Sequence, residues 1–600
     1  MCGIVGYAGR RPAVDIVVDG LRRLEYRGYD SAGVAIVSGG RLLTEKKAGK
    51  LANLEAALTI TEGTTGIGHT RWATHGGPTD RNAHPHLSAD NRIAVIHNGI
   101  IENFASLRAE LEATGIEFAS DTDTEVVAHL LARENAPLDV AMRHVVARLE
   151  GAFTLLAVSA DNPDTVVGAR RNSPLVVGRG DGENFLASDV SAFIAHTREA
   201  IELGQDQIVV ITPDSVEITD FAGVPVEGTD FHIDWDAAAA EKGGYEYFML
   251  KEIAEQPQAI ADTLLGRLTA DGIVLDEMCD LADITKVSIV ACGTAYHSGL
   301  VAKYAIEHWT RIPCEVELAS EFRYRDPILD RSTLVVAISQ SGETMDTLMA
   351  LRHAKEQGAR VLAICNTNGS TIPRESDAVL YTHGGPEIAV ASTKAFLTQL
   401  VACYLLGLYL AQVRGIMYAD EVGEVVRQLQ QTPDQLRELL DRMDSVRKLS
   451  RDLASATEVL FIGRHVGYPV ALEGALKLKE LAYMHAEGFA AGELKHGPIA
   501  LIDEGTPVIC VVPSSPTRDK VISNIQEVRA RGARTIVIAE DGDEAIGAYA
   551  DEVIRVPRVP TLLAPLMTTV PLQILACEIA AARGYDVDQP RNLAKSVTVE

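Results

Sequence analysis

Cys2 can act as a nucleophile together with its own α-amino group if the initiating Met1 is removed. The thiol and the free amine would then share one carbon, and an α-amine, whose pKa is ordinarily about 7.7 to 8.0, can serve as the general base. A simpler interpretation makes Cys2 the start of a short buried strand, and an isolated Met-Cys-Gly start favours that interpretation. Other residues must therefore decide between the two.

Polar motifs in the first third of the chain supply further parts of an amide-cleaving site. Beside a thiolate, such a site needs an oxyanion hole from a side-chain amide and a backbone N–H, and opposite charges that hold both ends of an amino acid. Each motif also has a simpler interpretation: Arg71 could form a structural ion pair, and Asn98-Gly99 could be a tight turn. The motifs occupy residues 27–33, 69–76, 82–86, 97–99 and 122–125.

Five of the sixteen histidines fall in this segment, so a metal site must be weighed against acyl transfer: His69, His75, His84, His86 and His97. No His-x-x-x-His pair or Cys/His spacing of a recognised zinc type accompanies them. We therefore expect no metal and no cofactor.

The elements that must position these motifs are short strands with few helices. Helical periodicity occurs over 13–24 and 124–133, so the first third is predicted to be an α+β domain rich in sheet. Apolar runs typical of strands are found at 3–7, 33–37, 93–96, 153–158, 164–167, 175–177 and 207–211.

The bulk composition excludes several classes of protein. The 600 residues carry a net charge of -28, which argues against nucleic acid and anionic membranes as partners. Eight cysteines without a CxxC pair fit reduced thiols in a cytoplasmic protein, and no secretory signal is evident. The only candidate membrane span, 394–414, is interrupted by polar residues and is better interpreted as a buried core helix.

A second pattern follows a junction at about 235–248, where charged, small and flexible residues interrupt the strands. From about 286 the order becomes strand, polar turn, helix, which indicates parallel α/β layers. The order of elements over 333–364 recurs over 508–539, so we predict two copies of one unit.

Hydroxyl-rich turns at predicted helix starts in the first copy indicate a phosphate site, because a helix N-terminus presents unpaired N–H groups to an anion. Ordinary N-capping is the alternative for any one turn. The absence of a Walker Gly-Lys-Ser/Thr pattern disfavours nucleoside triphosphates, so a phosphorylated small molecule is the expected ligand. The residues concerned are Cys292, Gly293, Thr294, Ser339, Gln340, Ser341, Thr344 and Ser392.

Glu473, Lys477 and Glu480 share one face of a predicted helix in the second copy, where a surface salt bridge is the default explanation. A carboxylate can also abstract a proton next to a carbonyl. An imine formed by a lysine with that carbonyl would acidify the same proton.

The first-third motifs, with Met-Cys-Gly-Ile-Val-Gly and His-Asn-Gly-Ile-Ile-Glu-Asn among them, resemble the glutaminase domain of the isomerising glutamine:fructose-6-phosphate aminotransferases (glucosamine-6-phosphate synthases). That domain is an N-terminal-nucleophile αββα sandwich. The resemblance implies Cys2 as nucleophile and Asn98 with Gly99 as oxyanion hole. It further implies that Arg71 binds the carboxylate and Asp123 the ammonium group of glutamine, that Thr74 and His75 line the pocket, and that Trp72 gates the exit of ammonia.

The second half resembles the two sugar isomerase (SIS) units of the same family, most specifically in Ser-Gln-Ser-Gly-Glu-Thr and in the C-terminal tail. The family often has serine at Ala295, which puts one sugar contact in doubt. The resemblance implies Glu480 as the acid/base, Lys477 as its neighbour, His496 as the ring-opening group and Lys595 as the Schiff-base amine. It also implies a homodimer in which His496 reaches the partner's site.

The expected architecture is therefore multidomain: an amidotransferase domain over 1–234, a linker over 235–248, and SIS units over 249–430 and 431–600. The resemblance implies transfer of the amide nitrogen of L-glutamine to D-fructose 6-phosphate, giving D-glucosamine 6-phosphate and L-glutamate, the first step of hexosamine and UDP-N-acetylglucosamine synthesis. Another ketose phosphate as acceptor, or a sugar-phosphate sensor without catalysis, are the alternatives. The set of predicted catalytic residues exceeds what a sensor needs.

Overall fold

The computed structural model describes residues 2–233, 242–269, 272–275, 278 and 281–598. The chain forms two compact units, one of residues 1–239 with the tail 594–600 and one of residues 240–593. Much of the predicted linker lies outside the described residues, and helix α6 (Phe248–Leu264) follows it.

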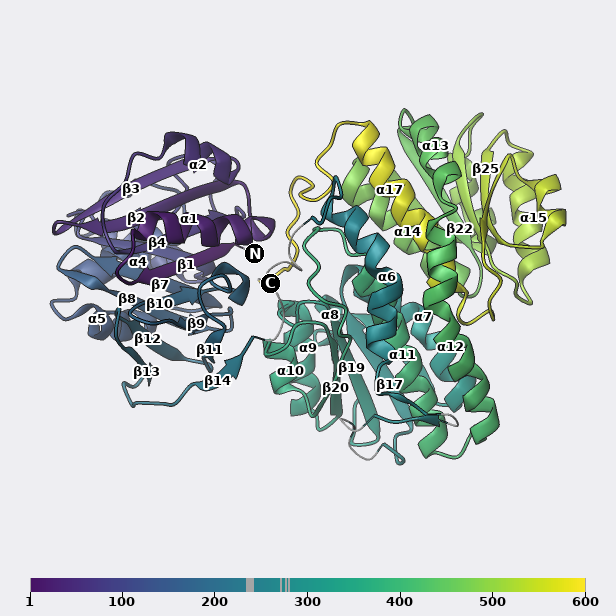
Figure 1. The fold of residues 1–600 in the computed structure, drawn as a ribbon, viewed down its shortest axis with the longest axis horizontal. Coiled ribbons are helices and arrows are strands. Elements are labelled where there is room, and N and C mark those ends of the chain that lie inside the picture. The colour runs from purple at the N-terminus through teal and green to yellow at the C-terminus, as the bar shows by residue number, and fades with distance from the viewer. Residues whose placement is uncertain (1, 234–241, 270–271, 276–277, 279–280, 599–600) are drawn as a thin grey trace. The chain divides into compact units, whose positions relative to one another are not determined.

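Two antiparallel sheets form the centre of the first unit (Figure 1). One has the order β14-β11-β9-β10-β1-β4-β2-β3 and the other β13-β12-β8-β7-β6-β5. The strands of the first sheet are β1 (Gly3–Ala8), β2 (Ser31–Ser38), β3 (Arg41–Ala48), β4 (Thr65–Arg71), β9 (Val176–Arg179), β10 (Asn184–Ala187), β11 (Glu199–Glu202) and β14 (Thr229–His232). Those of the second are β5 (His86–Leu87), β6 (Ile93–Gly99), β7 (Phe153–Ser159), β8 (Asn162–Arg171), β12 (Gln207–Ile211) and β13 (Val216–Asp220).

Three separate hydrophobic clusters divide this unit into four layers. One cluster packs helix α1 (Ala13–Leu24) on the first sheet, a second fills the space between the sheets, and a third packs helices on the second sheet. The αββα sandwich is thereby confirmed. The remaining helices are α2 (Leu51–Ala57), α3 (Phe104–Glu112), α4 (Glu125–Arg133) and α5 (Leu138–Val146).

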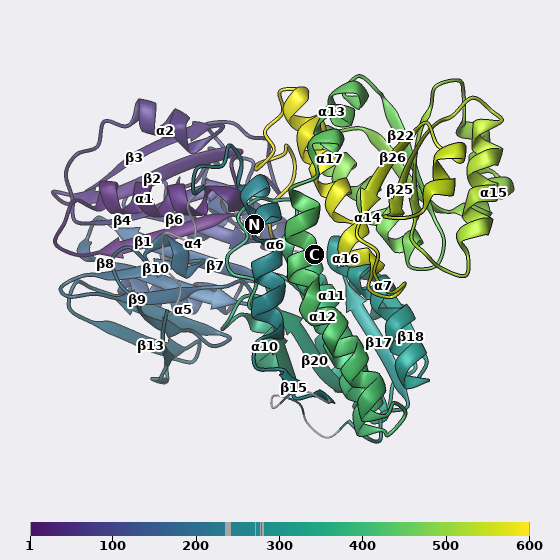
Figure 2. The same cartoon turned by 45° about the vertical axis from the view of Figure 1, so that its right-hand side comes forward.

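Two parallel five-stranded sheets with the same strand order make up most of the second unit, which confirms the predicted repeat (Figure 2). The order is β18-β17-β19-β20-β21 in one sheet and β23-β22-β24-β25-β26 in the other. The first copy has β17 (Lys286–Ala291), β18 (Cys314–Leu318), β19 (Thr333–Ser339), β20 (Arg360–Cys365) and β21 (Ala378–Tyr381). The second has β22 (Glu458–Gly463), β23 (His485–Ala490), β24 (Pro507–Val512), β25 (Arg534–Glu540) and β26 (Glu552–Val556). A two-stranded piece, β15 (Leu268–Thr269) and β16 (Gly272–Ile273), precedes them.

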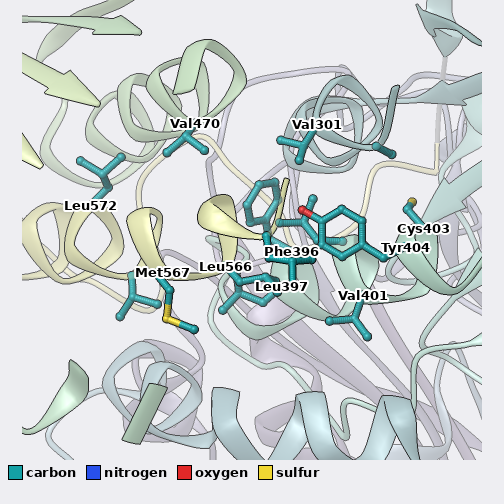
Figure 3. Packing of buried hydrophobic residues seen from close by; sticks show 14 of the residues in the cluster. Val301, Phe396, Leu397, Val401, Cys403, Tyr404, Val470, Leu566, Met567 and Leu572 are labelled. Carbon is teal, nitrogen blue, oxygen red and sulfur yellow. The ribbon is translucent and has the colours of Figure 1, made fainter. Parts of the chain in front are cut away.

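Helices of both copies share one hydrophobic core (Figure 3). Phe396 and Leu397 of the first copy lie near Leu566 and Met567 of the second, and the Tyr404 hydroxyl donates to the carbonyl of Leu562 at 2.6 Å. The two copies are therefore joined by their apolar surfaces. The helices are α7 (Gly293–Thr310), α8 (Ala319–Phe322), α9 (Met345–Glu356), α10 (Thr371–Glu375), α11 (Lys394–Val413), α12 (Ala419–Leu440), α13 (Asp444–Leu453), α14 (Gly467–Ala482), α15 (Arg518–Arg529), α16 (Ala564–Thr568) and α17 (Val570–Ala582).

Two stretches in the described residues are long and apolar enough to cross a membrane, namely α11 and the run Ala564–Ala582. The expectation of a single such stretch was therefore wrong. In the structure 83% and 89% of these stretches are buried, as in core helices.

Candidate functional site

Cys2 lies directly before strand β1, which positions its thiol beside the end of β4. The backbone N–H of Trp72 donates to Sγ of Cys2 across 3.2 Å. Burial raises the pKa of the Cys2 thiol, whereas the Trp72 backbone and the nearby Arg71 act in the opposite direction. The sulfur is thus held in a partly buried position beside a cation.

The predicted motif 27–33 supports the backbone around Trp72. The Asp30 carboxylate accepts from the N–H of Ala73 at 2.8 Å, and the Asp30 N–H donates to the carbonyl of Arg71 at the same distance. A Cβ on Gly28 would lie 2.8 Å from the carbonyl carbon of Arg71 and the nitrogen of Trp72, so only glycine fits there.

Asn98 and Gly99 end strand β6 instead of forming an isolated hairpin turn. The Asn98 side-chain amide donates to the backbone carbonyl of Cys2 at 2.8 Å. Gly99 has φ +123°, and a Cβ there would lie 2.0 Å from the carbonyl oxygen of Ala152. The tight-turn alternative is therefore wrong, and the pair lies next to the nucleophile.

A pocket in the first unit joins Cys2 to both charged residues of the predicted glutamine site. Arg71 and Asp123 are each 3% exposed, and Arg71 Nη1 makes no hydrogen bond to a described residue, so that it can serve a ligand anion. Nη2 of Arg71 donates to the carbonyls of His75 and Gly76 and holds that loop. The pocket is lined by Cys2, Arg71, Trp72, Thr74, His84, His97, Gly99, Asp123, Thr124 and Thr598.

Several of these lining residues were not predicted. His84 and His97 came into consideration only as metal ligands, and Thr124 was part of a motif without an assigned role. Thr598 belongs to the tail, which groups with the first unit. His75, a predicted lining residue, is not among the residues that line the pocket; its ring packs edge-on against Phe104.

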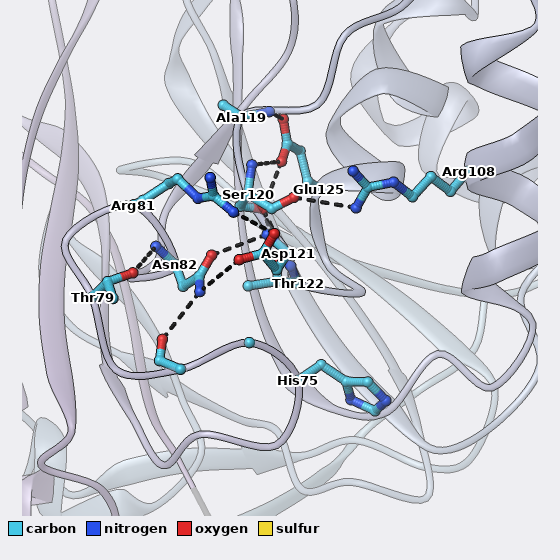
Figure 4. Close-up of polar contacts among 12 residues, drawn as sticks. His75, Thr79, Arg81, Asn82, Arg108, Ala119, Ser120, Asp121, Thr122 and Glu125 are labelled. Atoms are coloured by element: carbon cyan, nitrogen blue, oxygen red, sulfur yellow. Dashed lines mark hydrogen bonds and ion pairs between the residues drawn. The ribbon is translucent and has the colours of Figure 1, made fainter.

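Polar contacts hold the segment that carries Asp123 (Figure 4). The Asn82 side chain accepts from the N–H of Asp121 at 3.0 Å and donates to the Gly77 carbonyl at 3.1 Å. Glu125 accepts from the N–H groups of Ala119 and Ser120, both at 2.7 Å. Burial alone would raise the pKa of Glu125, but its hydrogen bonds lower it to about 2. Asp123 therefore lies between anchored neighbours.

Four of the five histidines form a buried cluster at the pocket, and two of them, His84 and His97, line it. The rings of His69 and His84 stack with centroids 4.1 Å apart, and His86 packs edge-on against His84 at 4.8 Å. His97 Nδ1 lies 3.0 Å from the Thr124 hydroxyl. Burial lowers the pKa of His69 to about 3 and those of the other three below 6.5, so the rings are neutral.

The predicted phosphate turns of the second unit precede α7, α9 and α11. Their N-cap residues make no side-chain cap bond, so ordinary capping does not account for these described turns. In the second turn the Ser339 hydroxyl accepts from the Gly342 N–H at 3.0 Å and lies 2.9 Å from that of Thr344.

The start of α11 differs, because a carboxylate of the protein occupies it. Glu387 accepts from the N–H groups of Thr393 and Ala395 at 2.9 and 3.0 Å and from the Ser392 hydroxyl at 3.1 Å. An anion contact by Ser392 would have to displace or share this carboxylate.

Glu473 and Lys477 of α14 are buried, with side chains 0% and 1% exposed, so a surface salt bridge is excluded. Lys477 Nζ lies 2.5 Å from Glu480 Oε2 and 3.4 Å from Glu473 Oε1. Burial alone would lower the pKa of Lys477, but the carboxylates of Glu480 and Glu473 raise it, so the amine stays charged. The hydroxyl of Thr294, a predicted sugar contact, donates to Glu473 at 3.0 Å.

Three further positions were predicted for the sugar site, namely His496, Ala295 and Lys595. His496 is exposed at the end of a 3₁₀ turn over Ala491–His496, and Ala295 is half-buried in the first turn of α7. Lys595 is part of the tail that groups with the first unit. Their roles stay predictions.

Comparisons with known proteins agree with both halves of this description. Residues 55–220 match the family model of a glutamine amidotransferase domain, and residues 280–409 and 452–583 match that of the SIS domain. The chain is therefore an amidotransferase enzyme that carries two SIS domains. It belongs to the isomerising glutamine–fructose-6-phosphate aminotransferase family, as its curated relatives show.

A Streptomyces coelicolor relative named glutamine–fructose-6-phosphate aminotransferase [isomerizing] is 70% identical over 615 residues, covering 100% of both chains. A Mycobacterium tuberculosis relative of the same name is 65% identical over 624 residues, again with full coverage of both. The solved C-terminal domain of glucosamine-fructose-6-phosphate aminotransferase from Francisella tularensis matches with a TM-score of 0.56 and 40% identity. That match covers 58% of this chain and 100% of the solved one.

Proposed function

We propose that the protein moves the amide nitrogen of L-glutamine to D-fructose 6-phosphate and isomerises the product to D-glucosamine 6-phosphate, releasing L-glutamate. The full-length identity to aminotransferases of this name supports the reaction. One observation carries the assignment of glutamine cleavage to the first unit. Cys2 shares a pocket with Arg71 and Asp123, whose opposite charges suit the two ends of an amino acid.

In the glutamine half, Cys2 attacks the side-chain amide carbon, and ammonia leaves when the tetrahedral intermediate collapses to a thioester. Water then releases glutamate. The second N–H of Asn98 and the N–H of Gly99 stabilise the oxyanion, a contribution typically worth about 10²- to 10³-fold in kcat per donor. Arg71 binds the carboxylate, Asp123 the ammonium group, and Thr74 lines the pocket, while the backbone carbonyl of His75 holds the Arg71 side chain.

In the sugar half, the turns at 292–294 and 339–344 bind the phosphate, and Lys595 forms an imine with the open-chain ketose as water leaves. Ammonia then adds to the imine carbon and Lys595 leaves as a free amine. Glu480, held by Lys477, then moves the proton between the sugar carbons. The network around Lys477 supports this assignment, because the buried Lys477 amine lies 2.5 Å from the half-buried Glu480 carboxylate and fixes its position. Trp72 gates the passage of ammonia.

The proposal extends to a cytoplasmic homodimer in which the exposed His496 serves the sugar site of the other copy. Its exposure fits a residue that acts outside its own subunit.

Amide-¹⁵N glutamine supplied with fructose 6-phosphate tests the reaction. We expect the label in glucosamine 6-phosphate by mass spectrometry, with one glutamate formed for each amino sugar. Glutamate formed without labelled amino sugar would contradict the proposal. Unlabelled glutamine with ¹⁵N-ammonium is the control for exchange through solvent.

A further inference from the structure

His297 of helix α7 contacts the buried network of α14, although no role in the proposed reaction has been given to it. Its Nδ1 lies 2.7 Å from Oε2 of Glu473, and its side chain is 13% exposed. Thr294, one turn earlier on α7, donates to the other oxygen of Glu473 at 3.0 Å. Helix α7 thus supplies a donor to each oxygen of a carboxylate that is 0% exposed.

The hydrogen on His297 Nδ1 follows from its partner. Burial alone would raise the pKa of Glu473, but Lys477 and the hydrogen bond from His297 lower it, so Glu473 is a carboxylate and can only accept. His297 therefore donates from Nδ1.

The two donors on Glu473 explain why Lys477 pairs unequally with its two carboxylates. Glu473 has a donor from α7 on each oxygen and lies 3.4 Å from Nζ of Lys477, whereas Glu480 lies 2.5 Å away. A buried carboxylate that lost one of these donors would attract the nearest cation more strongly. Lys477 would then move toward Glu473 and away from Glu480.

We infer that His297 is a positioning residue for the isomerisation: its Nδ1–H satisfies Glu473, so that Lys477 holds Glu480 against the sugar. The inference rests on the acid/base role proposed for Glu480. It also links the two SIS copies, because α7 begins at the phosphate turn of the first copy and α14 belongs to the second.

Two amide substitutions separate this role from a general structural one. Asparagine places its N–H close to the position of Nδ1, whereas glutamine places it close to that of Nε2, and both are polar residues of similar size. His297→Asn should keep the bond to Glu473 and His297→Gln should lose it. His308→Gln, at an exposed histidine near the end of the same helix, is the matched control.

We expect His297→Gln to lower kcat for glucosamine 6-phosphate formation at least about tenfold, with KM for fructose 6-phosphate changed by less than about threefold. His297→Asn and His308→Gln should stay within about threefold of the wild-type kcat. Glutamine hydrolysis, a property of the other unit, should be unchanged in all three and reports that the protein is intact.

A wild-type kcat in His297→Gln, an equal loss in both His297 variants, or a loss confined to KM would overturn the inference. Failure of the wild-type protein to form glucosamine 6-phosphate would instead overturn the proposed function on which it rests.

Discussion

The side-chain amide of Asn98 donates to the backbone carbonyl of Cys2 across 2.8 Å, so the nucleophile and the proposed oxyanion donor are hydrogen-bonded to each other. The orientation of the amide is fixed from behind, because Nε2 of His69 lies 3.1 Å from its oxygen and 2.9 Å from the carbonyl of His97. Both partners are acceptors, so Nε2 carries the hydrogen. One N–H of Asn98 is left for the substrate.

Asn98→Ala should lower kcat for glutamine hydrolysis about 10²- to 10³-fold, because the developing oxyanion loses a positioned donor. KM for glutamine should change much less, since the donor acts mainly in the transition state. Steady-state glutaminase kinetics measure both. Asn53→Ala, at an exposed asparagine of the same unit, is the control. A loss seen only in KM would assign Asn98 to substrate binding.

Cys2→Ala should abolish glutamine-dependent amino-sugar synthesis while fructose 6-phosphate still binds, because the thiol acts only in the first unit. Isothermal titration with the sugar phosphate and a coupled synthesis assay measure the two properties. Cys2→Ser, which keeps a weak nucleophile of similar shape, should bind glutamine without turning it over at the wild-type rate. Full glutamine-dependent activity in Cys2→Ala would disprove the nucleophile assignment.

Residues fused ahead of Cys2 should silence glutamine use, because the α-amine that serves as general base would then be an amide. A cleavable N-terminal extension tests this in one preparation. Glutaminase activity should be absent before cleavage and appear once cleavage leaves Cys2 at the terminus. An extension at the C-terminus cannot serve as the control, because the C-terminal tail belongs to the same unit as Cys2 and an extension there can also disturb that unit. Equal activity before and after cleavage would show that another group is the base.

The buried histidines should make the first unit less stable in acid. His69 has a pKa of about 3 in the folded protein against 6.5 when exposed, so between these pH values the unfolded chain binds a proton at His69 and the folded chain does not. The free energy of unfolding is therefore highest above about pH 6.5 and decreases toward pH 3, with a loss of about 2 kcal/mol at pH 5 from His69 alone.

Thermal unfolding of the intact protein between pH 8 and pH 5 measures this effect. As the pH is lowered, the unfolding temperature of the first unit should fall more steeply in the wild type than in His69→Gln, which cannot gain a proton at that position. Parallel pH dependences in the two proteins would contradict the assignment of His69 as a buried neutral ring.

Lys595→Ala and Lys595→Arg should both stop amino-sugar formation, because neither side chain forms an imine with the ketose. Borohydride treatment of the wild-type protein with fructose 6-phosphate should attach the reduced sugar to Lys595, which peptide mass spectrometry locates. Glutamine hydrolysis in the variants serves as the control. Turnover of the sugar in either variant would refute the Schiff-base role.

Local sequence patterns were sufficient where neighbouring residues determine the structure. Helix α1 spans the predicted 13–24, and the two predicted copies fold with the same strand order, because apolar periodicity is a local property. Strand β3 was not predicted, since its sequence Arg-Leu-Leu-Thr-Glu-Lys-Lys-Ala is charged. It lies at the edge of its sheet, where charged side chains stay in solvent.

Contacts between residues that are far apart in the sequence could not be predicted from local patterns. The sequence places Glu473, Lys477 and Glu480 on one face, but it does not reveal that His297, 176 residues earlier, contacts Glu473. That contact depends on how helices α7 and α14 pack in three dimensions.

The shared core of the two SIS copies has a consequence for their independence. Helix α11 is apolar on nearly every side, and so is the run Ala564–Ala582, yet each is covered largely by helices of the second unit. A fragment cut between the copies would expose part of this core, because α7 packs on α14 and α6 packs on α17. The copies are thus duplicates in topology but not separable modules, and isolated halves should aggregate.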